Sequence, residues 1–305
     1  MQRIAIIGAG LAGLAAAGRL AAAGHSVRIF DKGRGPGGRL ATRRITHAGV
    51  EHRFDHGAQY LRAEGLGFGA VLAEAGTLAW PDPARRVAVP GMSALGRHLA
   101  QGHDLATGRQ VVGIERVEGG WGLRHRDAAR PREPKSLDAG FDAVLVTVPA
   151  EQAIPLLPRF AGRLGAIRYA PCWTVMAAFG ERLDRPDVLR TDDGGMIGWA
   201  ARDSAKPGRD ATQENWVVQA GPGWSRDHLE DAPESVAQAL SSAIAPGVGP
   251  LFAVAHRWRY ALLEVPLGEA CLWDGALGYA SDGCLGGRGE AAWDSGVALA
   301  AAVLG

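Results

Sequence analysis

The chain has 305 residues, and its 33 Lys and Arg against 32 Asp and Glu leave a formal net charge of +1. This balance argues against a protein that holds nucleic acid by bulk positive charge. Three cysteines are too few for a disulfide framework, and no apolar run reaches the roughly 20 residues of a membrane span. Glycine is the outlier, with 44 residues, about twice its usual share of roughly 7%.

The amino-terminal segment alternates between strand-like and helix-like patterns. Residues 4–7 are a short β-branched run that predicts a buried strand. A G-x-G-x-x-G motif follows at 8–13 and opens an Ala- and Leu-rich stretch to Ala23, which predicts a helix. Residues 26–30 alternate like a second strand that ends at Asp31. This order of strand, turn, helix, strand and acid is typical of a dinucleotide-binding unit.

Each glycine of this motif has a structural role that a larger residue could not fill. Gly8 permits the tight turn, Gly10 lets a pyrophosphate approach the backbone, and Gly13 lets the helix pack closely against the strand. The start of the helix offers N–H groups to phosphate, and Asp31 can accept the ribose hydroxyls. The alternative is an ordinary strand-to-helix turn that is rich in glycine.

The segment after Asp31 predicts a second contact with the same ligand. Residues 32–39 read Lys-Gly-Arg-Gly-Pro-Gly-Gly-Arg and cannot form a regular element. A nest of backbone N–H groups followed by the Arg39 guanidinium suits a pyrophosphate. A surface loop with an incidental arginine is the alternative.

Residues 4–39 resemble the FAD fingerprint of the flavin amine oxidase superfamily, in which Gly-Gly-Arg follows the acidic residue. The chain is also similar to the renalase-like branch of that superfamily in the segments 39–44, 54–60, 89–95 and 256–261. Four short segments near the carboxyl end resemble the superfamily's carboxyl-terminal flavin motif: Ser281-Asp282-Gly283, Gly286-Gly287-Arg288, Glu290-Ala291-Ala292-Trp293 and Ser295-Gly296. The resemblance spans nearly the whole chain and is weakest between about 180 and 255.

The resemblance implies FAD bound without a covalent link, because no cysteine matches the covalent-flavin motif of monoamine oxidase. It implies that the backbone of Val111 meets adenine and that Asp282 meets the ribityl or phosphate oxygens. The start of the last helix, near Gly289, would face the flavin; a helix that only packs is the alternative. The full set expected at the cofactor is Gly8, Gly10, Leu11, Ala12, Gly13, Asp31, Lys32, Gly38, Arg39, Gly57, Ala58, Gln59, Val111, Asp282, Gly283, Arg288, Ala291 and Ala292. No metal site is expected.

The expected fold class is α/β: a Rossmann-type FAD domain with two dinucleotide-binding motifs, and a second α+β substrate domain on a mainly antiparallel sheet. We expect residues 1–60, 87–150 and 266–305 in the discontinuous FAD domain, and residues 61–86 and 151–265 in the substrate domain. The remaining predicted elements are strands at 110–114, 121–123, 141–149, 173–179, 195–201, 216–220 and 252–260, an exposed loop at 127–139, and helices at 232–245 and 290–304.

Few side chains are needed for hydride transfer to a flavin, because the protein must chiefly orient the substrate. Tyr60, His256 and Trp258 are the predicted catalytic residues, on segments expected to pass the flavin. His256, Trp258 and Tyr260 would share one face of a strand, with Arg257 and Arg259 on the other. Core packing is the alternative for each of them, above all for the histidine.

Lysine is rare in this chain, which bears on the reaction. Many amine oxidases of the superfamily keep a lysine near the flavin N5 atom. The three lysines here are Lys32, beside the ribose acid, and Lys135 and Lys206, both expected in polar loops. None is well placed for that role, which counts against a plain amine oxidase.

The leading hypothesis is a renalase-like FAD oxidase that oxidises dihydro isomers of NAD(P)H to NAD(P)⁺ and reduces dioxygen to hydrogen peroxide. An amine oxidase or a desaturase-type FAD oxidoreductase is the alternative, and a protein with a purely structural flavin is a third possibility. We expect a small-molecule substrate, no nucleic acid and no membrane span. The first strand begins without a preceding signal-like segment, so a cytoplasmic location is expected.

Overall fold

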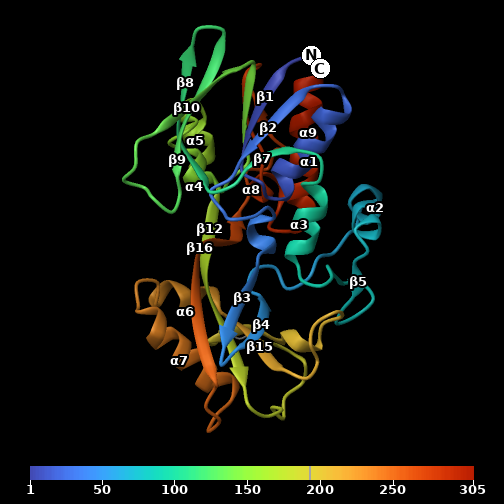
Figure 1. The fold of residues 1–305 in the computed structure, drawn as a ribbon, viewed down its shortest axis with the longest axis vertical. Helices are drawn as coiled ribbons and strands as arrows, with labels where there is room; N and C mark the ends of the chain where they lie inside the picture. Colours follow the sequence, from blue (N-terminus) through green and yellow to red (C-terminus); the bar gives the residue numbers. More distant parts are fainter. Residues whose placement is uncertain (192–193) are drawn as a thin grey trace.

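A mainly parallel sheet forms the half of the molecule that holds both chain termini (Figure 1). The computed structural model describes residues 1–191 and 194–305. The strand order is β17-β18-β11-β1-β2-β7, and every neighbouring pair is parallel except β17 and β18. The strands are β1 (Arg3–Ile7), β2 (Ser26–Phe30), β7 (Asp104–Ala106), β11 (Ala143–Val146), β17 (Leu272–Trp273) and β18 (Leu277–Tyr279).

Two layers cover this sheet, because successive side chains of β1 point to opposite faces. Ile4 and Ile6 pack towards α1 (Leu11–Ala22) and α9 (Gly289–Leu304), which lie side by side. Ala5 and Ile7 pack towards the meander of β8 (Arg109–Val117), β9 (Gly120–Asp127) and β10 (Ser136–Phe141). The predicted strands at 4–7 and 26–30 and both predicted helices of this half are confirmed.

The meander corrects two sequence-based boundaries. Residues 136–139, expected in an exposed loop, belong to β10 and pair with β9. Phe141, expected in a strand of the parallel sheet, ends β10 and is fully buried. The parallel strand is therefore only β11, shorter than predicted, because an apolar run cannot distinguish a turn between two buried strands from one long strand.

The other half is built on a five-stranded antiparallel sheet of order β13-β14-β15-β12-β16. Its strands are β13 (Val188–Arg190), β14 (Ile197–Arg202), β15 (Glu214–Ala220), β12 (Arg168–Phe179) and β16 (Phe252–Val265). The long strands β12 and β16 pair over most of their length and reach up to the first half (Figure 1). The strands predicted at 173–179, 195–201, 216–220 and 252–260 are confirmed, and the α/β class with it.

Two helices cover one face of this sheet, α6 (Pro222–Asp227) and α7 (Pro233–Ile244). Val236, Leu240 and Ile244 of α7 pack with Trp173 and Trp216 in one apolar cluster. The helix predicted at 232–245 is confirmed. Helix α6 was not predicted from the sequence, although Pro222 at its first position suits the start of a helix.

A hairpin of β3 (Thr42–His47) and β4 (Val50–Asp55) covers the other face of the antiparallel sheet. Phe54 packs there with Met176 and Val217. The hairpin thus belongs in sequence to the expected FAD domain and packs on the other half; the domain boundaries stay a prediction. The remaining elements are α2 (Leu66–Glu74), β5 (Leu78–Ala79), β6 (Arg86–Val87), α3 (Ser93–Leu99), α4 (Ala150–Ala153), α5 (Ala161–Leu164) and α8 (Asp282–Leu285). Within the described ranges, none of the helices has the length and apolar character to cross a membrane.

Candidate nucleotide and substrate site

The turn between β1 and α1 has the shape of a phosphate cradle. Gly8 has a φ of 110°, which favours glycine, and a Cβ on Gly13 would collide with the Gly8 carbonyl oxygen. Around Gly10, by contrast, a Cβ would meet nothing within 4 Å. Gly10 precedes α1 without a side-chain cap, so the turn leaves an open backbone and a helix start available to an anion.

Asp31 holds this turn in place. Its two carboxylate oxygens accept the backbone N–H groups of Ala9 and Gly33, both at 2.6 Å. Each oxygen keeps a lone pair after one such bond, so the acid can still accept a ribose hydroxyl. Its contact with ribose stays a prediction.

The second glycine segment lies directly against the first. The N–H of Gly37 donates to the Ala9 carbonyl at 2.8 Å, and a Cβ on Gly38 would lie 3.6 Å from the Gly10 Cα. Both Gly37 and Gly38 have positive φ angles. The fold thus brings two glycine turns into one concave backbone surface, and this surface fits a pyrophosphate.

Arg39 connects this surface to the carboxyl-terminal motif. Its guanidinium donates to Asp282 at 2.5 Å and to the Ala261 carbonyl of β16 at 3.2 Å, and the Tyr169 hydroxyl donates to Asp282 at 2.9 Å. Burial opposes the charge of Arg39, but Asp282 outweighs it and raises the pKa of the guanidinium. Burial, with Asp282 adding to it, raises the pKa of Tyr169. Tyr169 was missed, because its position within a mainly apolar strand gives no signal.

The loop after β4 is held against Arg39. The N–H of Ala58 donates to the Arg39 carbonyl at 2.8 Å, and a Cβ on Gly57 would collide with that carbonyl. The Gly57 carbonyl accepts the side-chain amide of Gln219, on β15, at 2.8 Å. Gly57 and Ala58 therefore lie beside Arg39, and all three residues belong to the set predicted at the cofactor.

The other predicted cofactor residues lie around the same half. Ser281 caps α8 by accepting the N–H of Gly283 at 3.0 Å, and Ala291 and Ala292 are buried in the first turn of α9. Val111 is buried opposite His125 in the meander. Two predicted residues meet side chains instead: Lys32 donates to Gln152 at 2.9 Å, and the exposed Arg288 donates to Glu64 at 2.5 Å.

Glu290 is a structural residue that the sequence analysis named only as part of a motif. Its buried carboxylate accepts the backbone N–H groups of Glu64, at 2.9 Å, and Gly65, at 2.7 Å. These N–H groups precede α2, so Glu290 ties the start of α2 to the start of α9.

Two of the three predicted catalytic residues come together, and His56 joins them. The ring centroids of His256 and Trp258 are 4.4 Å apart, and those of His56 and Trp258 are 5.2 Å apart. The indole N–H of Trp258 donates to the His56 carbonyl at 2.9 Å. We call His56, His256 and Trp258 the aromatic cluster.

The third predicted catalytic residue lies in a different group. The Tyr60 ring is 5.5 Å from that of Trp199 and lies under the Arg85 guanidinium at 4.7 Å. On β16, Arg257 and Arg259 both pair with Glu230, which confirms that they face away from the aromatic cluster. The catalytic roles of Tyr60, His256 and Trp258 stay predictions.

The electrostatic environment of the aromatic cluster is neutral to positive. Burial, followed by His256 and Arg43, lowers the pKa of His56 to about 4, and burial and Arg43 lower that of His256. Both imidazoles are therefore uncharged near neutral pH. Arg43 is half-buried, and within residues 1–191 and 194–305 no carboxylate oxygen lies within 4 Å of its guanidinium.

The expectation for Lys206 is wrong. It does not lie in an exposed polar loop: its side chain is fully buried, within 2.5 Å of Asp203, 3.2 Å of Gln59 and 3.4 Å of Asp55. Burial of a lysine requires charged or polar partners, and two of these, Asp55 and Gln59, come from a segment about 150 positions away. The spacing of Asp203 and Lys206 on one helical turn was the available signal.

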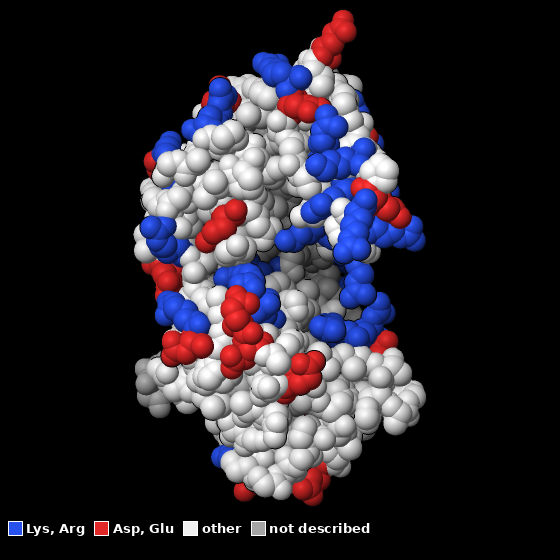
Figure 2. Space-filling model, turned by 90° about the vertical axis from the view of Figure 1, so that its left-hand side faces the viewer, with Lys and Arg blue, Asp and Glu red and all other residues white. Residues whose placement is uncertain are grey.

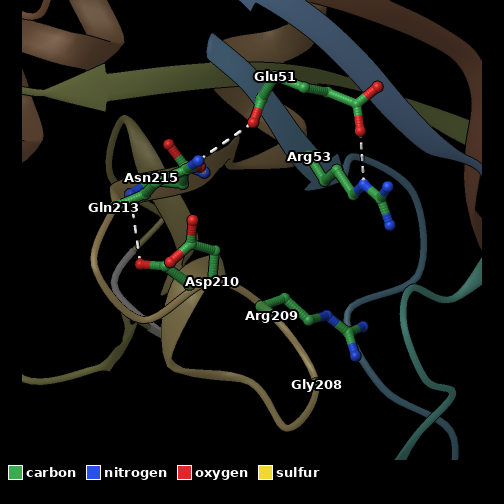
Figure 3. A pocket seen from close by; sticks show the side chains of 8 residues that line it. Glu51, Arg53, Gly208, Arg209, Asp210, Gln213 and Asn215 are labelled. Carbon is green, nitrogen blue, oxygen red and sulfur yellow. Dashed lines mark hydrogen bonds and ion pairs between the residues drawn. The ribbon is translucent and has the colours of Figure 1, made fainter.

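The surface of the protein has a cavity and a hollow that are open to solvent. A cavity of about 380 Å³ lies between β4 and the segment 204–215 and is lined by both acids and arginines, among them Glu51, Arg53 and Arg209 (Figure 3). Figure 2 shows a hollow between the two halves of the molecule, with Lys and Arg side chains gathered around it.

Comparison with known proteins places the fold. Residues 6–73 match the NAD(P)-binding Rossmann-like domain family. A zeta-carotene-forming phytoene desaturase of Myxococcus xanthus is 58% identical over 38 residues, and a 4,4'-diapophytoene desaturase of Staphylococcus haemolyticus is 60% identical over 38 residues. Each match covers 12% of this chain and only 7% or 8% of the relative.

Solved structures match over the whole chain. A redesigned putrescine oxidase aligns with a TM-score of 0.70 at 13% identity, covering 99% of both chains. Wild-type putrescine oxidase bound to putrescine aligns with a TM-score of 0.68, also at 13% identity and 99% of both chains. The protein therefore has the fold of putrescine oxidase, with a Rossmann-like NAD(P)-binding domain at its amino-terminal end.

Proposed function

We propose that this protein is a renalase-like FAD-dependent oxidase that converts dihydro isomers of NAD(P)H to NAD(P)⁺. In the balanced reaction, the dihydro isomer, dioxygen and one proton give NAD(P)⁺ and hydrogen peroxide. Bound FAD would accept the hydride from the substrate and pass two electrons to dioxygen. The chain itself would bind the cofactor, orient the substrate and exclude unsuitable partners.

The cofactor would be held by the elements that meet at Arg39. The glycine turns around Gly10 and Gly38 would carry the pyrophosphate, and the positive end of α1 would favour its charge. Asp282 and Arg39 would meet polar groups of the cofactor from the opposite side. We also propose the domain division at 1–60, 87–150 and 266–305 against 61–86 and 151–265.

The observation that carries the choice of substrate is the charge around the aromatic cluster. A dihydro nicotinamide dinucleotide brings a flat neutral ring and negative phosphates. Trp258 offers a flat apolar surface, His56 and His256 are kept uncharged, and Arg43 is a cation without a carboxylate partner in the described structure. This combination favours a planar, phosphate-bearing substrate over a cationic amine.

The second candidate is an amine oxidase or a desaturase-type oxidoreductase on the same scaffold. It is favoured by the putrescine-bound structure that shares the fold over 99% of both chains and by the short desaturase match. An amine oxidase would have to hold a protonated amine near Arg43, where Asp55, an acid that acts on His56, is already paired with Lys206 and Arg209.

Anaerobic reduction of the purified protein tests the proposal. The visible flavin absorbance should bleach rapidly on addition of the 2- or 6-dihydro isomers of NADH or NADPH, and putrescine or a carotenoid precursor should leave it unchanged. The reaction should also release NAD(P)⁺ and, after air is admitted, hydrogen peroxide, and both products can be measured. Bleaching by the amine or the polyene alone would overturn the proposal in favour of the second candidate.

A further inference from the structure

A buried cluster of four charged side chains joins the two halves of the molecule. We call Asp55, Asp203, Lys206 and Arg209 the junction cluster. The Lys206 ammonium contacts Asp203 at 2.5 Å and Asp55 at 3.4 Å, and the Arg209 guanidinium contacts Asp55 at 2.5 Å. The side chains are between 0% and 3% exposed, so water screens none of these charges.

Asp55 also collects contacts from two further segments. One carboxylate oxygen accepts the Thr42 hydroxyl at 2.6 Å and the Met92 N–H at 2.8 Å. The backbone N–H of Asp55 donates to Asp203 at 3.2 Å, and Arg209 donates to the Ala88 carbonyl at 2.7 Å. The cluster therefore fastens the hairpin, the segment 88–92 and the segment 203–209 at one point.

The cluster continues into the loop that carries His56. Gln59 accepts from Lys206 through its side-chain oxygen at 3.2 Å, and its amide nitrogen donates back to the carbonyls of Asp55, at 2.5 Å, and Gly57, at 3.2 Å. Lys206 thereby fixes which way the Gln59 amide points. Both ends of the loop 55–59 are held by this one ammonium group.

The charges balance, two acids against two bases. Burial opposes ionisation of Asp55, but Lys206 and Arg209 outweigh it and lower the pKa of this acid. Burial, together with the charge of Asp55, raises the pKa of Asp203. Removal of Lys206 alone would leave one negative charge in excess, and Asp203 is the group that would take up a proton.

We propose that Lys206 is a positioning residue: through Asp55 and Gln59 it fixes the loop 55–59, and so sets His56 against Trp258 and Gly57 and Ala58 against Arg39. The ammonium touches neither the aromatic cluster nor the glycine turns; its effect passes through the loop. The role holds for either substrate class, so it stands independently of the function proposed above.

Hydrogen exchange of the full-length protein tests this role. In the variant Lys206→Met, the backbone amides of residues 55–60 should exchange about tenfold faster or more, because the buried charge is no longer balanced. Glu214→Gln is the matched control, since it breaks a buried ion pair with Arg202 within the antiparallel sheet. That variant should speed exchange around 214–220 and leave 55–60 as in the parent.

Charge rescue separates positioning from general loss of stability. The double variant Asp203→Asn, Lys206→Met restores the balance of one acid and one base but still lacks the ammonium contacts with Asp55 and Gln59. Residues 55–60 should therefore still exchange about threefold faster than in the parent, or more. Mild acidification of Lys206→Met should remove only the part of the effect that comes from the excess charge, because an acid whose pKa is raised by folding stabilises the folded protein more as the pH falls. Exchange of residues 55–60 should remain faster than in the parent.

Exchange of residues 55–60 in these variants can also overturn the proposal. If Lys206→Met leaves exchange of residues 55–60 unchanged, or speeds it no more than Glu214→Gln does, Lys206 does not position this loop. If Lys206→Met does not fold, the double variant decides: exchange at 55–60 within about twofold of the parent would show that charge balance, and not contact with the ammonium, holds the loop, and would overturn the proposal.

Discussion

Two buried ion clusters lie next to each other in sequence and differ in what they connect. Arg202 pairs with Glu214 at 2.9 Å and with Asp187, all from the antiparallel sheet and its connections. The junction cluster begins one residue later, at Asp203, and reaches the hairpin and the loop beside Arg39. Similar side chains thus stabilise one sheet in the first case and align two halves around a site in the second.

This difference indicates which buried charged clusters affect stability alone and which also affect the site. A cluster confined to one sheet is expected to affect stability alone, since its loss changes no distant geometry. A cluster that joins segments far apart in sequence is expected to affect stability and the site together. Glu214→Gln therefore serves as the control for each of the following variants.

The largest effect is expected for Asp55→Asn. The change leaves Lys206 and Arg209 with a single acid between them, and breaking a buried ion pair from one side costs about 3–5 kcal/mol. Equilibrium denaturation should show this loss, together with weaker FAD binding. Glu214→Gln breaks the buried ion pair with Arg202 from one side in the same way, so it should also cost about 3–5 kcal/mol but leave FAD binding unchanged. Equal FAD affinity in both variants would remove the distinction between the two clusters.

The next effect concerns the pH dependence of stability through His56. Its pKa is about 4 in the folded protein against an ordinary 6.5, so the unfolded chain binds the proton more readily. The contribution of the uncharged His56 to the free energy of unfolding is therefore full above about pH 6.5 and is lost as the pH falls through 4, a change of about 3 kcal/mol. The difference in unfolding free energy between the parent and His56→Phe should show this slope, and a flat difference would contradict it.

A smaller loss is expected for Asp282→Asn at the cofactor. The exchange removes the charge that accepts from Arg39 and Tyr169 and keeps the shape. FAD affinity of the apoprotein, followed by flavin fluorescence, should weaken by about 10–100-fold, as for a hydrogen bond to a charged group. Unchanged affinity would place FAD away from Asp282.

The smallest effect is expected for Arg43→Gln. If Arg43 meets a substrate phosphate, KM for the dihydro isomers should rise about tenfold with kcat nearly unchanged, since a rim charge contributes mainly to binding. Arg44→Gln is the control, because Arg44 is the next residue of β3 and points to the opposite side. Equal KM values in both variants would exclude this role of Arg43.

The local elements were largely predictable from sequence, because they depend on near neighbours. The strand at 26–30, the glycine turn at 8–13 and the helix at 233–244 each carry their own pattern of apolar side chains or glycines. The outcome at 136–141 shows the limit: the residues pair with β9, and no local pattern states which strand will be the partner.

The site was predictable in its motifs and unpredictable in its contacts. Arg39 and Asp282 were both expected at the cofactor, but their pairing depends on a fold that joins positions 243 apart. The prediction for Lys206 was wrong for the same reason. A lysine among polar residues is expected to be exposed, and its buried partner Asp55 is far away in the sequence. The place of Gln59 at the cofactor stays a prediction, and the contact of its side chain with Lys206 had no signal in the sequence. Whether a charged side chain is buried depends on its tertiary partners, and a single sequence does not reveal which residues these are.

The most direct test of the central claim is stopped-flow reduction of the flavin without oxygen, with a 2- or 6-dihydro isomer of NAD(P)H and putrescine supplied in separate runs to one preparation. We expect fast bleaching by the dihydro isomer and none by putrescine. Glu214→Gln should behave as the parent, and Arg43→Gln should need more isomer for the same rate. Fast bleaching by putrescine, with the isomer inert, would contradict the account.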